Sequence, residues 1–317
     1  MTVLRTVAWL VFALACCAAN AFPTRPVTMI VPQPPGGAND VLVRTIANKL
    51  QEIWNQPVVV DYRPGGGVVV GTQAIARSAP DGHTIGLITS AHTINANVRE
   101  DLPYDSVKDF APVARIGHYV IAMVATPGFE ANDVKSLIAL AKQKTGQLEY
   151  ASLGIGGSTH LAGELLKFMG GIDMVHIPYN GSAPAYRDML GGRVSLAFVI
   201  LNSALPHVKA GKLKVIGITN PKRSQVYPEF PTIGETIPGY ELITWAGFAV
   251  PGAVPAEWVK KLSADAMTAM GAPDVRRRLI DSGLEPAPQP ASEFQAFLRS
   301  ETERWGKIVR EVKFKLD

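Results

Sequence analysis

The chain has 317 residues, of which 47% are hydrophobic and 18% are charged, and its formal net charge is +4. This length allows one large or two ordinary domains with sizeable cores. The small net charge and the absence of a basic run in the sequence give no sign of nucleic-acid binding.

The N-terminal stretch 1–21 has the features of a secretory signal peptide. Residues 7–15 are almost wholly apolar, and Ala19-Asn20-Ala21 matches an A-x-A cleavage site. The apolar run is too short to span a membrane. An uncleaved anchor and a lipid attached to Cys16 are the alternatives. We expect export to the periplasm, with a mature chain that starts at Phe22.

Both cysteines of the chain, Cys16 and Cys17, lie in this leader. The mature protein would therefore enter an oxidising compartment without disulfides, and a chain of this size needs none to be stable. Removal of the leader leaves 30 basic and 27 acidic residues. The mature protein is thus nearly neutral.

The first predicted unit is a strand over 27–31, a Gly/Pro loop over 32–40 and a helix whose apolar residues fall on one stripe from Val41 to Ile53. Gly36 and Gly37 let the backbone turn sharply and approach a bound group. Asn39 or Asp40 can cap the helix start. Free N–H groups there favour an anion, although a tight turn with ordinary caps explains the loop equally well.

Two similar units follow the first. A strand over 57–61 leads through a Gly-rich loop to a helix over 69–76, and a strand over 84–89 ends in Ser90-Ala91-His92-Thr93. Three such units in a row predict a parallel sheet with helices on its faces. Ligands of such sheets bind outside the carboxyl ends of the strands, so the three loops should share one edge.

The middle of the chain repeats this rhythm after a polar, proline-marked connection that we expect over 102–105 and 109–113. Helices are expected over 133–144 and 161–169, and another one ends at Leu190. The expected strands are 119–125, 148–152, 174–177, 194–200 and 214–219. The sequence therefore predicts a second α/β lobe, without a repeat strong enough to indicate duplication.

The C-terminal part begins with an irregular, proline-rich stretch over 221–238. A strand over 244–250 and three helices, expected over 256–270, 273–282 and 291–312, should return to the first lobe. Chain crossings near 119–125 and 237–244 would form a hinge. We expect lobe 1 to comprise 22–122 and 243–317, and lobe 2 to comprise 123–242.

The loop 154–160 resembles the first loop in design. Ser158 and Thr159 offer hydroxyl and N–H groups at a helix start, and glycines open the space around them. The loop could face 35–39 across a cleft and form a clamp. The alternatives are a glycine-rich turn capped by Ser158 and a His160 that packs inside the helix.

Enzymatic readings find little support. The sequence contains no G-x-S-x-G elbow and no G-x-x-x-x-G-K-[ST] loop. Gly65 and Gly67 lack the third glycine of a dinucleotide fingerprint, because Val70 stands in its place. The six histidines show no close metal-ligand spacing. We expect neither catalysis, nor a metal, nor a cofactor.

A set of short motifs runs through the mature chain in a specific order. Each motif alone is weak, but together they are specific. They are Val31-Pro32-x-Pro34-Pro35-Gly36-Gly37-x-x-Asp40, Arg63-Pro64-Gly65-x-Gly67 with Gly71, Pro80-Asp81-Gly82-x-Thr84, Leu102-Pro103-Tyr104-Asp105, Ser158-x-His160-Leu161, His176-x-Pro178-Tyr179-x-Gly181, Gly191-Gly192, Ala210-Gly211-Lys212-Leu213, Phe230-Pro231-Thr232 and Trp245-x-Gly247.

With these motifs the chain resembles the Bug-type extracytoplasmic solute-binding receptors, the TctC-like component of tripartite tricarboxylate transporters. The resemblance implies a two-lobe, periplasmic-binding-protein-like (type II) α/β fold with a hinge and an interlobe cleft. It also implies a small carboxylate ligand, held by backbone amides and ordered water. The receptor would be a monomer that delivers its ligand to separate membrane permease subunits.

The resemblance and the predicted loop positions together give a set of expected ligand contacts. The first-lobe loops supply most of them, and the opposing lobe supplies the rest. The set is Gln33, Pro35, Gly36, Gly37, Ala38, Asn39, Asp40, Ser90, His92, Ser158, Thr159, His160 and Tyr179.

Some positions depart from the family's pattern. Gln33 replaces a residue that is usually aromatic or apolar, Tyr62 replaces a common Asn, and Val68 stands where a glycine often follows Gly67. Val199 replaces an acidic residue that could recognise an amino group. Its absence argues weakly against an amino-acid ligand.

Two other classes share parts of this pattern. A regulator effector domain can have the same two-lobe architecture, but it would need a DNA-binding helix-turn-helix where this chain has its signal peptide. A periplasmic sensor that reports ligand to a membrane kinase would look the same in sequence, so transport and sensing both stay open.

Overall fold

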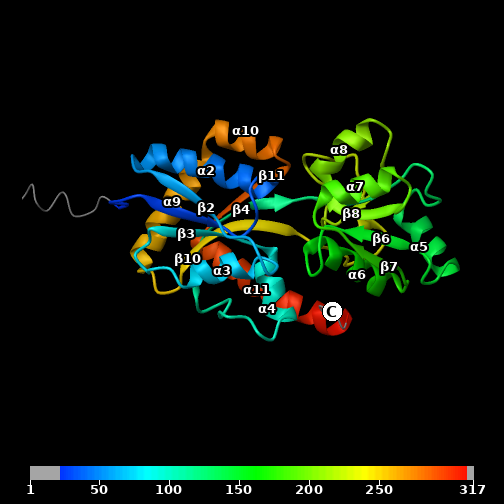
Figure 1. Cartoon of the computed structure of the whole chain (residues 1–317), viewed down its shortest axis with the longest axis horizontal. Coiled ribbons are helices and arrows are strands. Elements are labelled where there is room, and N and C mark those ends of the chain that lie inside the picture. Colours follow the sequence, from blue (N-terminus) through cyan, green and yellow to red (C-terminus); the bar gives the residue numbers. More distant parts are fainter. Residues whose placement is uncertain (1–21, 313–317) are drawn as a thin grey trace, which may run out of the picture.

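The computed structural model of the protein describes residues 22–312. The predicted signal peptide and its cleavage site lie outside the described residues. Within 22–312, no helix is long and apolar enough to cross a membrane. The described chain folds into two α/β lobes, each built around its own sheet (Figure 1).

The first lobe contains a six-stranded mixed sheet. The three strands expected at the start of the chain run parallel to one another, and β10 joins them antiparallel beside β3. The order is β11-β4-β10-β3-β1-β2. The strands are β1 (Val27–Val31), β2 (Val58–Tyr62), β3 (Thr84–Thr89), β4 (Phe110–Tyr119), β10 (Thr244–Pro251) and β11 (Leu284–Pro290).

Helices cover both faces of this sheet (Figure 1). One face carries α2 (Ala38–Trp54), α9 (Ala256–Gly271) and α10 (Pro273–Asp281), whose apolar sides form one large core with the strands. The other face carries α3 (Val69–Ala76) and the first turns of α11 (Ala291–Val312). The elements β10, α9 and α10 from the C-terminal part of the chain thus pack with the first sheet.

The second lobe is built on a five-stranded sheet in the order β7-β6-β8-β5-β9. Its strands are β5 (Ile121–Ala125), β6 (Glu149–Ser152), β7 (Val175–Pro178), β8 (Leu196–Ile200) and β9 (Lys214–Ile218). One face packs against α5 (Val134–Gln143) and α6 (Ser158–Gly170), and the other against α7 (Ser182–Leu190) and α8 (Leu201–Lys209). The 3-10 helix η2 (Ile233–Glu235) lies in the proline-rich stretch.

The chain first passes between the lobes at Val120. The stretch 119–125, expected as one strand, is in fact two, because Tyr119 ends β4 in the first sheet and Ile121 begins β5 in the second. The second passage lies between β9 and β10. There the Leu242 N–H still donates to the Thr219 carbonyl oxygen at 2.8 Å, so the chain leaves the second lobe shortly before Thr244.

Four elements differ from the sequence prediction. The stretch from Phe110 to Val113, expected as a connection, belongs to β4, and Pro112 is tolerated there because β11 pairs only with Ala114 and later residues of β4. Ser90, expected to follow a strand as loop, begins α4 (Ser90–Val98). The elements α8 and β11 were not anticipated.

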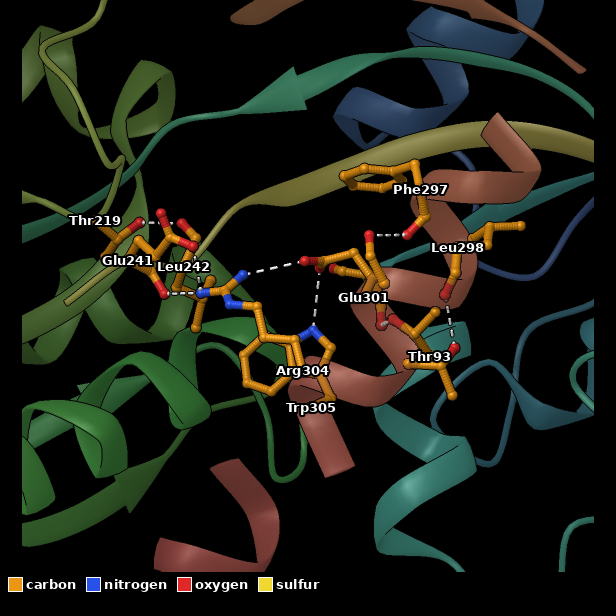
Figure 2. A network of polar contacts seen from close by, with 12 residues as sticks. Thr93, Thr219, Glu241, Leu242, Phe297, Leu298, Glu301, Arg304 and Trp305 are labelled. Carbon is orange, nitrogen blue, oxygen red and sulfur yellow. Dashed lines mark hydrogen bonds and ion pairs between the residues drawn. The ribbon is translucent and has the colours of Figure 1, made fainter. Parts of the chain in front are cut away.

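The C-terminal helix joins the lobes on one side of the molecule. Trp305 is fully buried and belongs, with Val309, to the core of the second lobe. Figure 2 shows the polar contacts beside it: Arg304 donates to the Glu241 carbonyl oxygen and pairs with Glu301 at 3.1 Å. The second half of α11 is thus anchored on the second lobe.

A second direct contact between the lobes lies near the start of β11. Glu285 accepts from His118 Nε2–H at 2.9 Å through one carboxylate oxygen and from the Ser224 hydroxyl through the other. Close by, a Cβ atom added to Gly283 would lie 2.2 Å from Cβ of Asn202 on α8. A side chain at Gly283 would therefore force these two elements apart.

Candidate ligand-binding site

The strand pairings bring the loop-bearing edges of the two sheets toward each other. In the first sheet, Tyr119 pairs with Thr244 and Thr89 pairs with Ala246, so the carboxyl ends of the parallel strands lie where the chain leaves the lobe. In the second sheet, Ile121 pairs with Ile200, and β6 runs parallel to β8. The loops after β1 and β6 therefore both lie on the edge from which the chain passes between the lobes.

The first of these loops ends at the start of α2. Gly37 is the N-cap residue, with φ −90° and ψ 177°, and no side chain caps the helix. Asn39 and Asp40 were expected as caps, but Asp40 occupies the third helical position and accepts from the Gly36 N–H at 2.8 Å. Gly36 has φ +90°, a conformation that strongly favours glycine.

The Asp40 carboxylate accepts several hydrogen bonds that hold this loop in place. Its other oxygen accepts from the Tyr62 hydroxyl and from Arg44 Nε at 2.7 Å. Burial by itself raises the pKa of Asp40, but the bonds from Tyr62, Gly36 and Arg44 outweigh it and leave the pKa below its usual value. The carboxylate stays ionised, and Arg44 compensates its charge.

Two backbone donors remain at this helix start. Across residues 22–312, no group accepts from the N–H of Ala38 or Asn39. The side-chain oxygens of Gln33 and Asn39 are buried without a partner in the same part of the chain. By contrast, the start of α5 is closed by the Asp133 side chain, which accepts from Ser136 N–H at 2.7 Å. The α2 start therefore keeps polar groups for a bound molecule.

The loop after β6 has the same design. Gly157 is the N-cap residue of α6, with φ −78° and ψ 167°, and no side chain caps the helix. The Thr159 hydroxyl accepts from Leu153 N–H at 2.9 Å, and His160 Nδ1 accepts from Gly156 N–H at 3.1 Å. As far as the structure describes the chain, nothing accepts from the N–H of Ser158 or Thr159.

The second-lobe residues expected to contact the ligand differ in the hydrogen bonds that their side chains make. Ser158 keeps its hydroxyl and N–H outside any hydrogen bond made by the described chain. Thr159 and His160 are buried and hold the loop with their side chains. Tyr179 donates its hydroxyl to Asp188 Oδ2 on α7 at 3.0 Å, so this hydroxyl is engaged within its own lobe.

Ser90 and His92, both expected as ligand contacts, lie in different surroundings. Ser90 is the first residue of α4, next to the edge where β3 ends. The His92 ring is buried in the first lobe. Its Nε2–H donates to the Ser106 carbonyl oxygen at 2.8 Å, and its centroid lies 4.7 Å from that of the Phe110 ring in an edge-to-face arrangement. Burial lowers the pKa of His92 to about 4. The structure places this side chain against the connection before β4.

Sequence reasoning overlooked His176 as part of the site. It lies on β7, pairs with Tyr150 on β6, and stacks on His160 with ring centroids 3.7 Å apart. The only sequence signal was its place in the His176-x-Pro178-Tyr179 motif. Among the residues that the structure describes, no group of three or more His, Cys, Asp or Glu side chains is arranged to hold a metal ion.

Comparison with known proteins adds independent findings. A family model described as "Tripartite tricarboxylate transporter family receptor" matches residues 42–314. Protein BugT of Bordetella pertussis is 33% identical over 301 residues, which cover 94% of this chain and 92% of BugT.

Two solved structures share the fold at appreciable identity. Rpa4515 of R. palustris, solved with adipate, is 32% identical with a TM-score of 0.82, over 92% of this chain and 98% of that one. MatC of Rhodopseudomonas palustris, solved with bound malate, is 28% identical with a TM-score of 0.78, over 91% of this chain and 100% of that one.

Proposed function

The chain belongs to the TctC family of tripartite tricarboxylate transporter receptors, and we propose that it binds a small dicarboxylate between its two lobes and delivers it to a membrane permease. The proteins of this family are periplasmic solute-binding receptors and not enzymes.

One observation supports this function above the others. The two lobes carry matched helix starts on facing edges. Within the described part of the chain, each start leaves two N–H groups without an acceptor, at Ala38 and Asn39 in one lobe and at Ser158 and Thr159 in the other. A helix start with free N–H groups favours an anion. Two such starts suit a molecule with an anionic group at each end, and the adipate and malate of the related structures have this chemistry.

The remaining parts of the proposal follow from the sequence. The leader directs the chain to the periplasm and is cleaved after Ala21. The protein is a monomer. Lobe 1, comprising 22–122 and 243–317, closes onto lobe 2, comprising 123–242, by rotation about the two passages of the chain. The structure's passage at Val120 supports a border close to the proposed one.

Adipate and malate should raise the melting temperature of the protein, whereas their diamides should not. A ligand at 100 times its Kd stabilises the folded state by about 2.7 kcal/mol, which corresponds to a shift of several degrees for a chain of this size. Thermal unfolding with each acid and its diamide provides the measurement. An equal response to a diamide would contradict the anion argument, and no response to a broad set of dicarboxylates would contradict the ligand class.

A further inference from the structure

The helix starts of α2 and α6 are built on one plan with a single chemical difference. In each, a glycine N-cap in an extended conformation is preceded by a glycine whose N–H is tied to a side chain four residues later. In the first lobe, Gly36 N–H donates to Asp40 at 2.8 Å. In the second, Gly156 N–H donates to His160 Nδ1 at 3.1 Å.

We propose that His160, seated on His176, is the positioning residue of the second-lobe loop and acts as the neutral counterpart of Asp40. By accepting from Gly156 it fixes the loop so that the Ser158 and Thr159 N–H groups point out to the ligand. It does this without placing a negative charge beside them. The inference rests on the proposed function and deepens it, because it names what orients one half of the anion site.

The hydrogen bond determines the tautomer of His160. A backbone N–H can only donate, so Nδ1 carries no proton and the ring hydrogen is on Nε2. Burial, and then the neighbouring His176 and Lys167, lower the pKa of His160 to about 3. The imidazole is therefore neutral across the physiological pH range, and its Nδ1 remains an acceptor.

His176 completes the support from the neighbouring strand. Its ring lies at 10° to that of His160, and its Nε2 is 2.7 Å from the Ser152 hydroxyl oxygen. That oxygen is 3.3 Å from both the N and the O of Gly154. The two stacked histidines thus fix the loop at two points, Gly154 and Gly156.

The charges around the pair are balanced. Glu164 on α6 accepts from the Tyr150 hydroxyl at 2.7 Å and forms an ion pair with Lys167 at 3.2 Å. Tyr150 itself stacks on His176. In the first lobe, Arg44 compensates the charge of Asp40. A carboxylate in place of the His160 ring would add a negative charge next to the anion-binding amides.

Three variants of His160 separate these roles. His160→Asn keeps an oxygen acceptor where Nδ1 stands, and its affinity for adipate should stay within about fivefold of the parent. His160→Leu removes the acceptor, and affinity should fall about tenfold or more, since the partly buried Gly156 N–H then loses its partner. His160→Asp keeps the acceptor but adds charge, so affinity should fall about tenfold and the loss should grow at low salt.

Isothermal titration calorimetry with adipate and malate measures these changes, with circular dichroism to confirm folding. The matched control is Asp133→Ala, which removes the cap of α5 in the same lobe and should leave affinity unchanged. Equal affinity for His160→Leu and the parent would overturn the proposal. A loss in His160→Asn as large as in His160→Leu would also overturn it, because packing and not the acceptor would then matter.

A second measurement does not depend on the ligand. Hydrogen exchange at the Gly156 amide in the free protein should be protected in the parent and in His160→Asn, and faster in His160→Leu. If the parent binds no carboxylate but shows this pattern, the proposed function fails and the positioning role stands. If Gly156 exchanges equally in all variants, the positioning role fails.

Discussion

Replacing Trp305 with alanine should lower the free energy of unfolding by about 3–5 kcal/mol, the usual range for a buried tryptophan. The side chain is fully buried in the second-lobe core, although it comes from the helix that begins on the first lobe. Its Nε1–H also donates to Glu301 Oε2 at 3.2 Å, and this carboxylate would lose a partner. The variant thus removes the main apolar contact that anchors α11 on the second lobe.

Urea unfolding measures this change, and Phe168→Ala provides the control. Phe168 is an aromatic residue on α6 in the same lobe, but it is 49% exposed, so its loss should change stability by only about 0.5 kcal/mol. If Trp305→Ala is as stable as Phe168→Ala, the Trp305 side chain does not anchor α11 on the second lobe.

Lowering the pH from 7 to 5 should destabilise the protein by roughly 4 kcal/mol through His92 and His160 alone. Burial lowers the pKa of His92 to about 4 and that of His160 to about 3, whereas an unfolded histidine titrates near 6.5. Between these values the unfolded chain binds protons that the folded protein does not. Stability is therefore complete above about pH 6.5 and falls by about 1.4 kcal/mol per pH unit for each histidine below it.

Urea unfolding at pH 7, 6 and 5 tests this slope against the variant that carries both His92→Asn and His160→Asn. His176, whose pKa is also lowered by burial, adds in the same direction and remains in the variant. Paired carboxylates such as Asp40, whose pKa lies below the usual value, stay ionised between pH 7 and pH 5. Their stabilising effect is lost only at lower pH, so they add nothing to this slope. A parent and variant with parallel stability profiles would show that these two side chains can be protonated without loss.

The sequence pattern was sufficient for much of the fold. Apolar runs, Gly-rich loops and amphipathic stripes predicted β1 to β3 and the helices other than α4 and α8, because these signals are local. It failed where tertiary contacts override local preference. The stretch Ser90–Val98 is rich in Ser, Thr and Asn, which favour helices poorly, yet it forms α4. Pro286, Pro288 and Pro290 argue against a strand, yet β11 pairs at the edge of the sheet with an irregular register.

The site was predictable at the level of loops but not of side chains. The glycines and a helix start after each loop followed from the sequence, but α2 begins at Ala38, before the position that a cap at Asn39 or Asp40 implied. The direction of each side chain depends on neighbours distant in sequence. Tyr62 reaches Asp40 from the next strand, and His176 reaches His160 from another. For this reason the side chains of Asp40 and His160, expected as ligand contacts, are found to accept from the N–H groups of glycines in their own loops.

We propose that four backbone amides, those of Ala38, Asn39, Ser158 and Thr159, hold the two ends of a dicarboxylate. Amide-resolved NMR of the mature protein, titrated with adipate, malate and their diamides, tests it most directly. We expect the amide protons of these four residues to shift downfield with the diacids and to saturate together, because both ends of one molecule bind at once. Diacid binding that leaves these four resonances in place, or that moves only one lobe's pair, would contradict the account.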